Sequence, residues 1–234
     1  MESPPQRRYI TSGKIVRVAQ HTAQKMNRIS RRLGVGGYIL AGGQSQRMGR
    51  DKALLELSGK TLLARAASLL EPLTGTPTVI GPPELYSSSS LRVIADLTPR
   101  IGPLGGILTA LGDSQSPWNL ILGCDLPFLT AEWLAYLIDR ALDSDADAVI
   151  PQSLAGAEPL CAMYHKRSEP EISSAVSRGV RKVTDGLAAL TIEPVPPSEW
   201  KQFDAGGRLF QNMNSPEDFE AARALFGGRS TEAD

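Results

Sequence analysis

Short apolar runs alternate with segments of helical spacing along most of this chain, and this alternation limits its possible folds more than any other feature. The predicted strands are residues 35–40, 76–80, 91–94, 118–122, 148–150 and 160–164. The predicted helices are residues 61–73, 103–111 and 130–142, with a last helix that Ser215 caps. Strands that alternate with helices of this length indicate βαβ units. The sequence therefore predicts an α/β fold with a single doubly wound, mostly parallel sheet.

The 234 residues are enough for one such domain with a buried core. We expect residues 35–228 to form this domain, between a basic extension at residues 1–34 and a tail at residues 229–234. The proline- and serine-rich stretches Pro194–Ser198 and Ser87–Ser90 are typical of surface loops within the domain.

The net charge of zero conceals an uneven distribution of charge. Residues 1–35 contain eight Lys or Arg and a single acid, which leaves 17 basic and 24 acidic residues in the rest of the chain. A basic arm on an acidic domain can bind nucleic acid or an acidic partner. Three other interpretations remain open: a disordered tail, an organelle transit peptide, or a protein that starts downstream at Met26. A role in nucleic-acid binding is not favoured.

Cysteine content and hydropathy favour a cytoplasmic protein. No run of about 18 apolar residues is present, so no membrane span is expected, and no apolar segment near the N-terminus indicates secretion. The two cysteines, Cys124 and Cys161, lie in apolar stretches, and we expect buried, reduced thiols.

A glycine pair directly follows the first predicted strand. The strand ends at Leu40 and leads into Ala41, Gly42 and Gly43. In open parallel sheets, ligands bind outside the carboxyl ends of the strands. Two glycines let the backbone approach an anion and turn its N–H groups toward it. The pair alone is more typical of a tight turn than of a ligand site, and it fits neither the Walker A pattern nor the dinucleotide fingerprint.

Two cations follow this loop within about ten residues, Arg47 and Lys52. A triphosphate needs backbone donors for its oxygens and cations that offset the charge formed during transfer. Arg47 can hold two oxygens at once, whereas Lys52 acts as a point charge. The loop and its two cations together therefore predict a site for nucleotide phosphates.

Acidic residues follow two later strands. Asp125 comes just after residues 118–122, and Asp96 comes after residues 91–94. Magnesium prefers carboxylate oxygens together with substrate phosphates, so Asp125 is our candidate metal ligand; the alternative is a cap on the next helix. Asp96 can accept hydrogen bonds from the guanine edge, from a ribose hydroxyl or from metal-bound water. These three roles for Asp96 remain open.

A third polar group lies near the C-terminus. Asn212 and Asn214 precede Ser215, and asparagine is a common loop residue beside a helix cap. Farther upstream, Arg178, Arg181 and Lys182 surround a glycine; they are either a solvated helix end or a contact for the phosphate of a substrate.

Several of these segments resemble one family. Residues 40–52 read LAGGQSQRMGRDK, and ALL at 53–55 and GKTLL at 59–63 follow. This string is similar to the signature of the MobA-like nucleotidyltransferases, and within them most similar to the molybdenum cofactor guanylyltransferases. The CDLP segment around Asp125, the GPLGG segment after Asp96 and FQNMNSPED at 210–218 also match. The resemblance runs from about Val35 to Phe226.

The resemblance implies a Rossmann-like, GT-A-like nucleotidyltransferase that transfers GMP from GTP to the phosphate of molybdopterin or Mo-molybdopterin and releases pyrophosphate. It implies Mg²⁺ as cofactor, held by Asp125 and by Asn214, with Asn212 as second candidate. Molybdoenzyme chaperones or apo-molybdoenzymes are further implied partners. The implied catalytic residues are Lys52, Arg47 and Asp125. The implied GTP-binding residues are Leu40, Ala41, Gly42, Gly43, Lys52, Asp96 and Asp125.

Two other functions remain open. A cytidylyltransferase acting on the same cofactor or on another small phosphate is the nearer one, although its relatives usually carry A-A-G where this chain has Ala41–Gly43. A non-catalytic nucleotide-binding protein would keep the glycines and lose the lysine or the metal ligand. Because Lys52 and Asp125 are both present, the sequence favours an enzyme.

Overall fold

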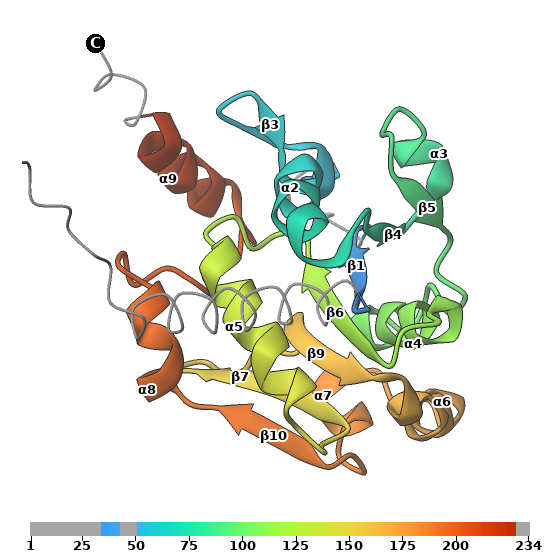
Figure 1. The fold of residues 1–234 in the computed structure, drawn as a ribbon. Coiled ribbons are helices and arrows are strands. Elements are labelled where there is room, and N and C mark those ends of the chain that lie inside the picture. Colours follow the sequence, from blue (N-terminus) through green and yellow to red (C-terminus); the bar gives the residue numbers. More distant parts are fainter. Residues whose placement is uncertain (1–33, 43–50, 228–234) are drawn as a thin grey trace, which may run out of the picture.

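One large sheet forms the centre of the molecule (Figure 1). A computed structural model describes residues 34–42 and 51–227. The strands of the large sheet are β1 (Gly36–Leu40), β4 (Thr78–Ile80), β5 (Arg92–Ile94), β6 (Trp118–Gly123), β7 (Ala148–Ser153), β8 (Gly156–Ala157), β9 (Cys161–His165) and β10 (Ile192–Val195). Their order is β10-β7-β9-β6-β1-β4-β5, and β8 pairs with β7. A small hairpin of β2 (Glu56–Leu57) and β3 (Lys60–Thr61) stands apart from this sheet.

Helices connect the strands in the way that βαβ units require. The α-helices are α2 (Leu62–Thr74), α3 (Pro83–Tyr86), α4 (Pro103–Asp113), α5 (Ala131–Leu142), α6 (Glu169–Ser177), α7 (Val183–Gly186), α8 (Pro197–Trp200) and α9 (Pro216–Gly227). The 3-10 helices are η1 (Lys52–Leu54), η2 (Lys166–Ser168) and η3 (Lys201–Phe203). Thr61 and Thr130 begin α2 and α5 as N-caps, because their side chains accept the amides of Ala64 and Trp133.

The central strands of the sheet bury both of their faces. Neighbouring residues of β6 belong to different core clusters: Leu120 and Leu122 pack in the cluster of α2 and α5, and Ile121 packs in the cluster of α4 and α6. Side chains of a strand alternate between faces, so this division places helices on both sides of the sheet. A third cluster joins the small hairpin to α9 through Leu57 and Ala222.

The predicted fold class is confirmed, and so are the predicted strands and helices. Parallel pairs join β6, β1, β4 and β5, and another joins β7 and β10. The direction of β9 was not predicted: this strand is antiparallel to both β6 and β7. The sequence did not indicate this direction, because a buried strand has the same apolar pattern whether it runs parallel or antiparallel to its neighbours.

One expected loop is not a loop. Residues 194–198 contain the end of β10 and the start of α8, so the interpretation of Pro194–Ser198 as a surface connection is wrong. Pro194 was the misleading signal, because proline lacks the N–H group that a central strand needs. β10 lies at the edge of the sheet, where one side of the strand pairs with no other strand of residues 34–42 and 51–227. Ser87–Ser90 does form the predicted turn.

Cys161 is buried, as expected, whereas Cys124 is only half-buried; both thiols are free. Within the described part of the chain, no helix combines the length and the apolar character that a bilayer span needs. The basic extension at residues 1–34 lies almost entirely outside the described residues, and the predicted domain boundaries stay predictions.

Candidate active site

The ends of β1, β4 and β6 are tied together by backbone hydrogen bonds. The amide of Cys124, just past β6, donates to the carbonyl of Leu40 (3.2 Å), and the amide of Ala41 donates to that of Ile80 (2.9 Å). Gly42 follows with φ of +94°, and a Cβ at this position would lie 2.7 Å from Cδ of Pro82. Only glycine combines this backbone conformation with so close an approach. The sequence-predicted turn therefore begins where three strands end.

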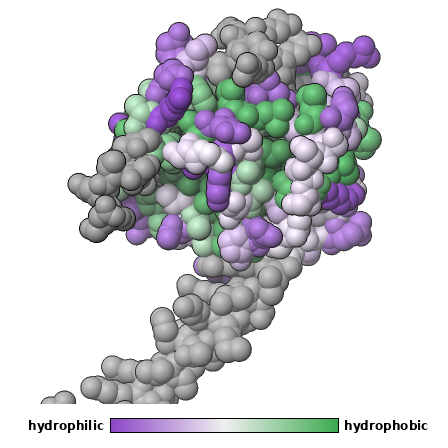
Figure 2. Space-filling view, turned by 90° about the horizontal axis from the view of Figure 1, so that it is seen from above, coloured by the Kyte–Doolittle hydropathy of each residue, from purple (hydrophilic) through white to green (hydrophobic). Residues whose placement is uncertain are grey.

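Lys52 begins η1, beside these strand ends. Its ammonium donates to Oδ1 of Asn214 at 3.0 Å, although the two residues are 162 positions apart. The hairpin, α3 and α9 lie toward the same end of the molecule, at the top of Figure 1. Figure 2 looks onto this end and shows hydrophobic residues interspersed with hydrophilic ones. The structure thus brings two of the predicted site residues into direct contact.

Asp125 completes this group. Its Oδ1 lies close to Gly123, so that a Cβ on Gly123 would be 2.9 Å from this oxygen. The backbone carbonyl of Asp125 accepts a hydrogen bond from the amide of Met213 at 2.9 Å. Burial raises the pKa of the Asp125 carboxyl, whereas the positive charge of Lys52 lowers it. The carboxyl of Asp125 is therefore partly removed from water, and the positive charge of Lys52 stabilises its ionised form. A bound cation would stabilise the ionised form in the same way.

The loop at residues 213–218 holds Asn214 in place. Oδ2 of Asp218 accepts the amides of Asn214 (3.0 Å) and Ser215 (2.9 Å), and the amide of Asp218 donates back to Oγ of Ser215 (3.1 Å). This reciprocal pair is a capping box at the start of α9. Because Met213 hydrogen-bonds to Asp125 on the other side, the loop is fixed at both ends. Asn212, the second candidate, is exposed.

Asp96 lies at the same edge of the sheet but beyond β4, on the loop after β5. Its Oδ1 accepts hydrogen bonds from the amide of Thr98 (2.8 Å), from Oγ1 of Thr98 (3.3 Å) and from Oγ1 of Thr109 (3.1 Å). One oxygen of the carboxylate therefore has a structural task, the shaping of the loop that leads into α4.

An open cavity of about 470 Å³ lies beside this loop. It is lined by Leu97, Thr98, Pro99, Arg100, Ile101 and Val176. The basic group of Arg178, Arg181 and Lys182 follows Val176 in the chain; it is exposed, with Arg178 bonded to Ser174 and Lys182 near Asp185.

The predicted site is thus partly assembled. Lys52, Asp125 and Asn214 form one group at the ends of β1 and β6, with Leu40, Ala41 and Gly42 beside them. Asp96 lies two strands away from β1. Gly43 and Arg47 lie outside the described residues. Among residues 34–42 and 51–227, no three His, Cys, Asp or Glu side chains converge as a metal cluster.

Comparison with known proteins identifies the family of this chain. The sequence model of the MobA-like NTP transferase domain matches residues 37–191. The chain belongs to this family. Among its relatives is the probable molybdenum cofactor guanylyltransferase of Chloroflexus aggregans, 31% identical over 200 residues that cover 82% of this chain and 95% of that protein. The protein of the same name from Synechococcus elongatus is 33% identical over 200 residues, covering 81% of this chain and 98% of the relative.

Solved structures share the fold of this MobA-like domain. Molybdopterin-guanine dinucleotide biosynthesis protein A from Archaeoglobus fulgidus superposes with a TM-score of 0.74 at 26% identity, covering 82% of this chain and 99% of that one. A 2-C-methyl-D-erythritol 4-phosphate cytidylyltransferase from Thermus thermophilus superposes with a TM-score of 0.61 at 17% identity, covering 82% and 98%. The second likeness concerns the fold alone.

Three residues that shape the MobA-like site were not predicted for it: Asp51, Tyr86 and Asp218. Asp51 caps η1 by accepting the amide of Ala53 (2.9 Å), and the hydroxyl of Tyr86 donates to the same carboxylate (2.7 Å). The partners Tyr86 and Asp51 are 35 positions apart. A local sequence pattern cannot reveal such a contact, although the capping box that contains Asp218 could have been found from its spacing.

Proposed function

We propose that this protein transfers GMP from GTP to the phosphate of molybdopterin, forming the molybdopterin guanine dinucleotide and releasing pyrophosphate. The observation that carries the proposal is the contact of Lys52 with Asn214 beside Asp125, at the carboxyl ends of β1 and β6. Relatives about 30% identical over most of the chain are named for guanylyl transfer in molybdenum cofactor synthesis, which supports the same substrates here.

The reaction is an in-line attack by the molybdopterin phosphate on the α-phosphorus of GTP. A new P–O bond forms as the bond from the α-phosphorus to the pyrophosphate oxygen breaks. A phosphate monoester is already ionised near neutral pH, so the attack needs no strong general base. Catalysis then depends on positioning and on charges aimed at the phosphates.

Each proposed site residue has one task in this reaction. The N–H groups of Gly42 and Gly43 hold phosphate oxygens, and Leu40 and Ala41 lead the chain to that point, since the amide of Ala41 already donates to Ile80. Lys52 offsets the negative charge that accumulates on the leaving pyrophosphate, and Arg47 holds two oxygens in its fork. Asp96 contacts the nucleoside portion through Oδ2, because Oδ1 accepts the hydrogen bonds from Thr98 and Thr109.

The donor set around Asp125 fits Mg²⁺. This ion takes one or two protein oxygens and completes its shell with water and substrate phosphates. Asp125 supplies a carboxylate whose ionised form is destabilised by burial unless a cation is near. Asn214 supplies an amide oxygen in the same group. When bound, the ion would neutralise charge on the phosphates. If Asn214 binds the ion, Lys52 would lose its hydrogen bond to Asn214 and could donate to a phosphate oxygen instead.

The test is a transfer assay on the full chain with GTP, Mg²⁺ and molybdopterin, with the dinucleotide product separated by chromatography. Calorimetric titration with GTP, CTP and ATP in the presence of Mg²⁺ accompanies it. We expect the guanine dinucleotide as product and binding that favours GTP. A clear preference for CTP, with the cytosine dinucleotide as product, would make the protein a cytidylyltransferase. Binding of GTP without any product would leave only a nucleotide-binding protein.

A further inference from the structure

The carboxylate of Asp51 lies directly before Lys52 and is held by both of its oxygens. Oδ1 accepts the amide of Ala53 at 2.9 Å, which begins η1, and Oδ2 accepts the hydroxyl of Tyr86 at 2.7 Å. A hydroxyl bonded to a carboxylate forms one of the stronger hydrogen bonds available to side chains. The backbone at Asp51 is therefore fixed by a contact from a distant part of the chain.

Tyr86 is built to deliver this contact. It is the last residue of α3, its side chain is 1% exposed, and it packs in the core cluster that contains Ile39 and Val79. Its backbone carbonyl accepts both the amide (3.0 Å) and the hydroxyl (2.7 Å) of Ser89. Because ring and backbone are both held, the hydroxyl has little freedom to leave Asp51.

The ring also lies against Gly81, the residue just past β4. A Cβ at Gly81 would lie 2.8 Å from Cε2 of Tyr86 and closer still to the carbonyl oxygen of Ala41, so glycine is required there. The same tyrosine therefore touches the end of β4 with its ring and the start of η1 with its hydroxyl. Tyr86 therefore holds Asp51 at a fixed position relative to the ends of β1 and β4, which precede the proposed phosphate-binding turn.

We propose that Tyr86 is a positioning residue for Lys52. Its hydroxyl fixes Asp51, Asp51 fixes the first turn of η1, and this turn sets the point from which the lysine side chain extends. At its other end the ammonium is held by Asn214 at 3.0 Å. The role in catalysis rests on the proposed guanylyl transfer, whereas the mechanical role in holding η1 does not.

Replacing Tyr86 by phenylalanine removes the hydroxyl and keeps the ring. For Tyr86→Phe we expect kcat to fall by about 10-fold, because small displacements of a catalytic group are costly, with KM for GTP changed less than about twofold. Tyr38→Phe is the matched control: Tyr38 is also buried and also donates to an aspartate, Asp113, at 3.0 Å. This control is expected to keep wild-type kcat.

Two companion variants separate positioning from charge. In Asp51→Asn, the amide oxygen can still accept from Ala53 and the amide nitrogen can donate to the tyrosine hydroxyl, so most activity is retained. Asp51→Ala loses both contacts. If Tyr86 acts through Asp51, adding Tyr86→Phe to Asp51→Ala lowers kcat no further. Independent, additive losses would overturn the proposed linkage.

Hydrogen–deuterium exchange tests the mechanical part without any reaction. In Tyr86→Phe, peptides that contain the amide of Ala53 are expected to exchange at least about fivefold faster than in the wild type, because the opening of a local contact controls exchange. Unchanged exchange together with unchanged kcat refutes the role of Tyr86. An inactive wild type with faster exchange in the variant refutes the proposed reaction instead, and leaves the restraint on η1 supported.

Discussion

The ammonium of Lys52 lies beside an amide oxygen, that of Asn214, and near the half-buried carboxylate of Asp125. Its ammonium is bonded to Asn214, and its charge partly offsets the burial that raises the pKa of Asp125. Sequence patterns nominated Asp125, which follows a strand, and Lys52, which follows the glycine turn, whereas the resemblance to the MobA-like family nominated Asn214. Their mutual contacts could not be predicted, because side-chain bonds across 162 positions depend on the packing of the whole sheet.

Removal of this cation is expected to stop the chemistry and spare the fold. We predict that Lys52→Ala lowers kcat by more than about 100-fold, the loss typical of deleting one group that stabilises transition-state charge. The melting temperature is expected to stay near that of the wild type, because surface ion contacts contribute little to stability. Rates are measured in the transfer assay, and unfolding by calorimetry.

Lys60→Ala is the matched control for this change. Lys60 is an exposed lysine of the nearby β3, so the variant alters net charge equally. Wild-type turnover in Lys52→Ala, or an equal loss in Lys60→Ala, contradicts the role given to Lys52.

At the scale of elements, hydrophobic periodicity predicted most of the fold. The core helices α2, α4 and α5 and the central strands have strong apolar patterns because they bury one or both faces. Elements at the edge are harder to predict. In β10, Pro194 is tolerated because the strand has one free side, and the weakly apolar α6 buries only Ile172 and Ala175. Elements at the edge of the sheet bury few apolar side chains, so their hydrophobic patterns in the sequence are weak.

The capping box of α9 is the element on which Asn214 depends. We predict that Asp218→Ala weakens Mg²⁺-dependent GTP binding by about 10-fold, since the amides of Asn214 and Ser215 lose their shared acceptor and the loop loses its restraint. Asp218→Asn, which keeps an acceptor oxygen, is expected to restore most of the affinity. Calorimetric titration with GTP and Mg²⁺ measures both variants.

Glu217→Ala provides the comparison for the lost charge. Glu217 lies in the same first turn and is exposed, so both alanine variants change net charge by the same amount. If Glu217→Ala and Asp218→Ala weaken GTP binding equally, the effect is electrostatic and the capping box is not what positions Asn214.

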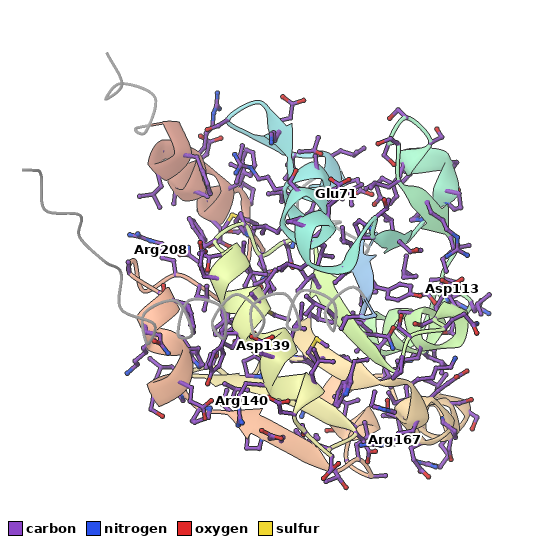
Figure 3. All side chains as sticks on the ribbon, in the orientation of Figure 1. Glu71, Asp113, Asp139, Arg140, Arg167 and Arg208 are labelled. Atoms are coloured by element: carbon purple, nitrogen blue, oxygen red, sulfur yellow. The ribbon has the colours of Figure 1, made fainter. Side chains whose placement is uncertain are left out.

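Over the whole molecule, two carboxylates join elements of the large sheet. Asp113 pairs with Arg92 of β5 (2.6 Å) and accepts the hydroxyl of Tyr38 (3.0 Å). Asp147 pairs with Arg167 (2.8 Å) and accepts the amide of Thr191 (3.0 Å). Figure 3 labels Asp113, the last residue of α4, and Arg167, which lies in η2 after β9. These contacts connect strands that are distant in sequence.

Both carboxylates make the free energy of unfolding depend on pH in the acidic range. The hydrogen bond from Arg92 lowers the pKa of Asp113, and that from Arg167 lowers the pKa of Asp147. The unfolded carboxyls protonate first, near their usual pKa of about 4. Their contribution to the free energy of unfolding is therefore complete above that pH, and it is lost as the pH falls through the lower pKa values of the folded protein.

We predict that Asp113→Asn lowers the free energy of unfolding at pH 7 by about 1 kcal/mol, a small value because Arg92 is largely exposed to screening solvent. The melting temperature is expected to fall by about 2–4 °C. Below pH 4 the variant is expected to lose stability less steeply than the wild type. Denaturant titrations at pH 3 and pH 7 check this, with the exposed Glu56→Gln as control. Identical acid slopes in all three proteins contradict the assignment.

The contact between Lys52 and Asn214 also has a consequence for protein synthesis. A ribosome makes Lys52 and Asp125 long before it makes Asn214, 162 residues after the lysine. A nascent chain that stops before Met213 already contains every strand of the large sheet. It lacks the loop that docks on Asp125 and the amide that holds the lysine. Translation therefore supplies every strand of the large sheet first, and it supplies Asn214, the proposed magnesium ligand, only afterwards.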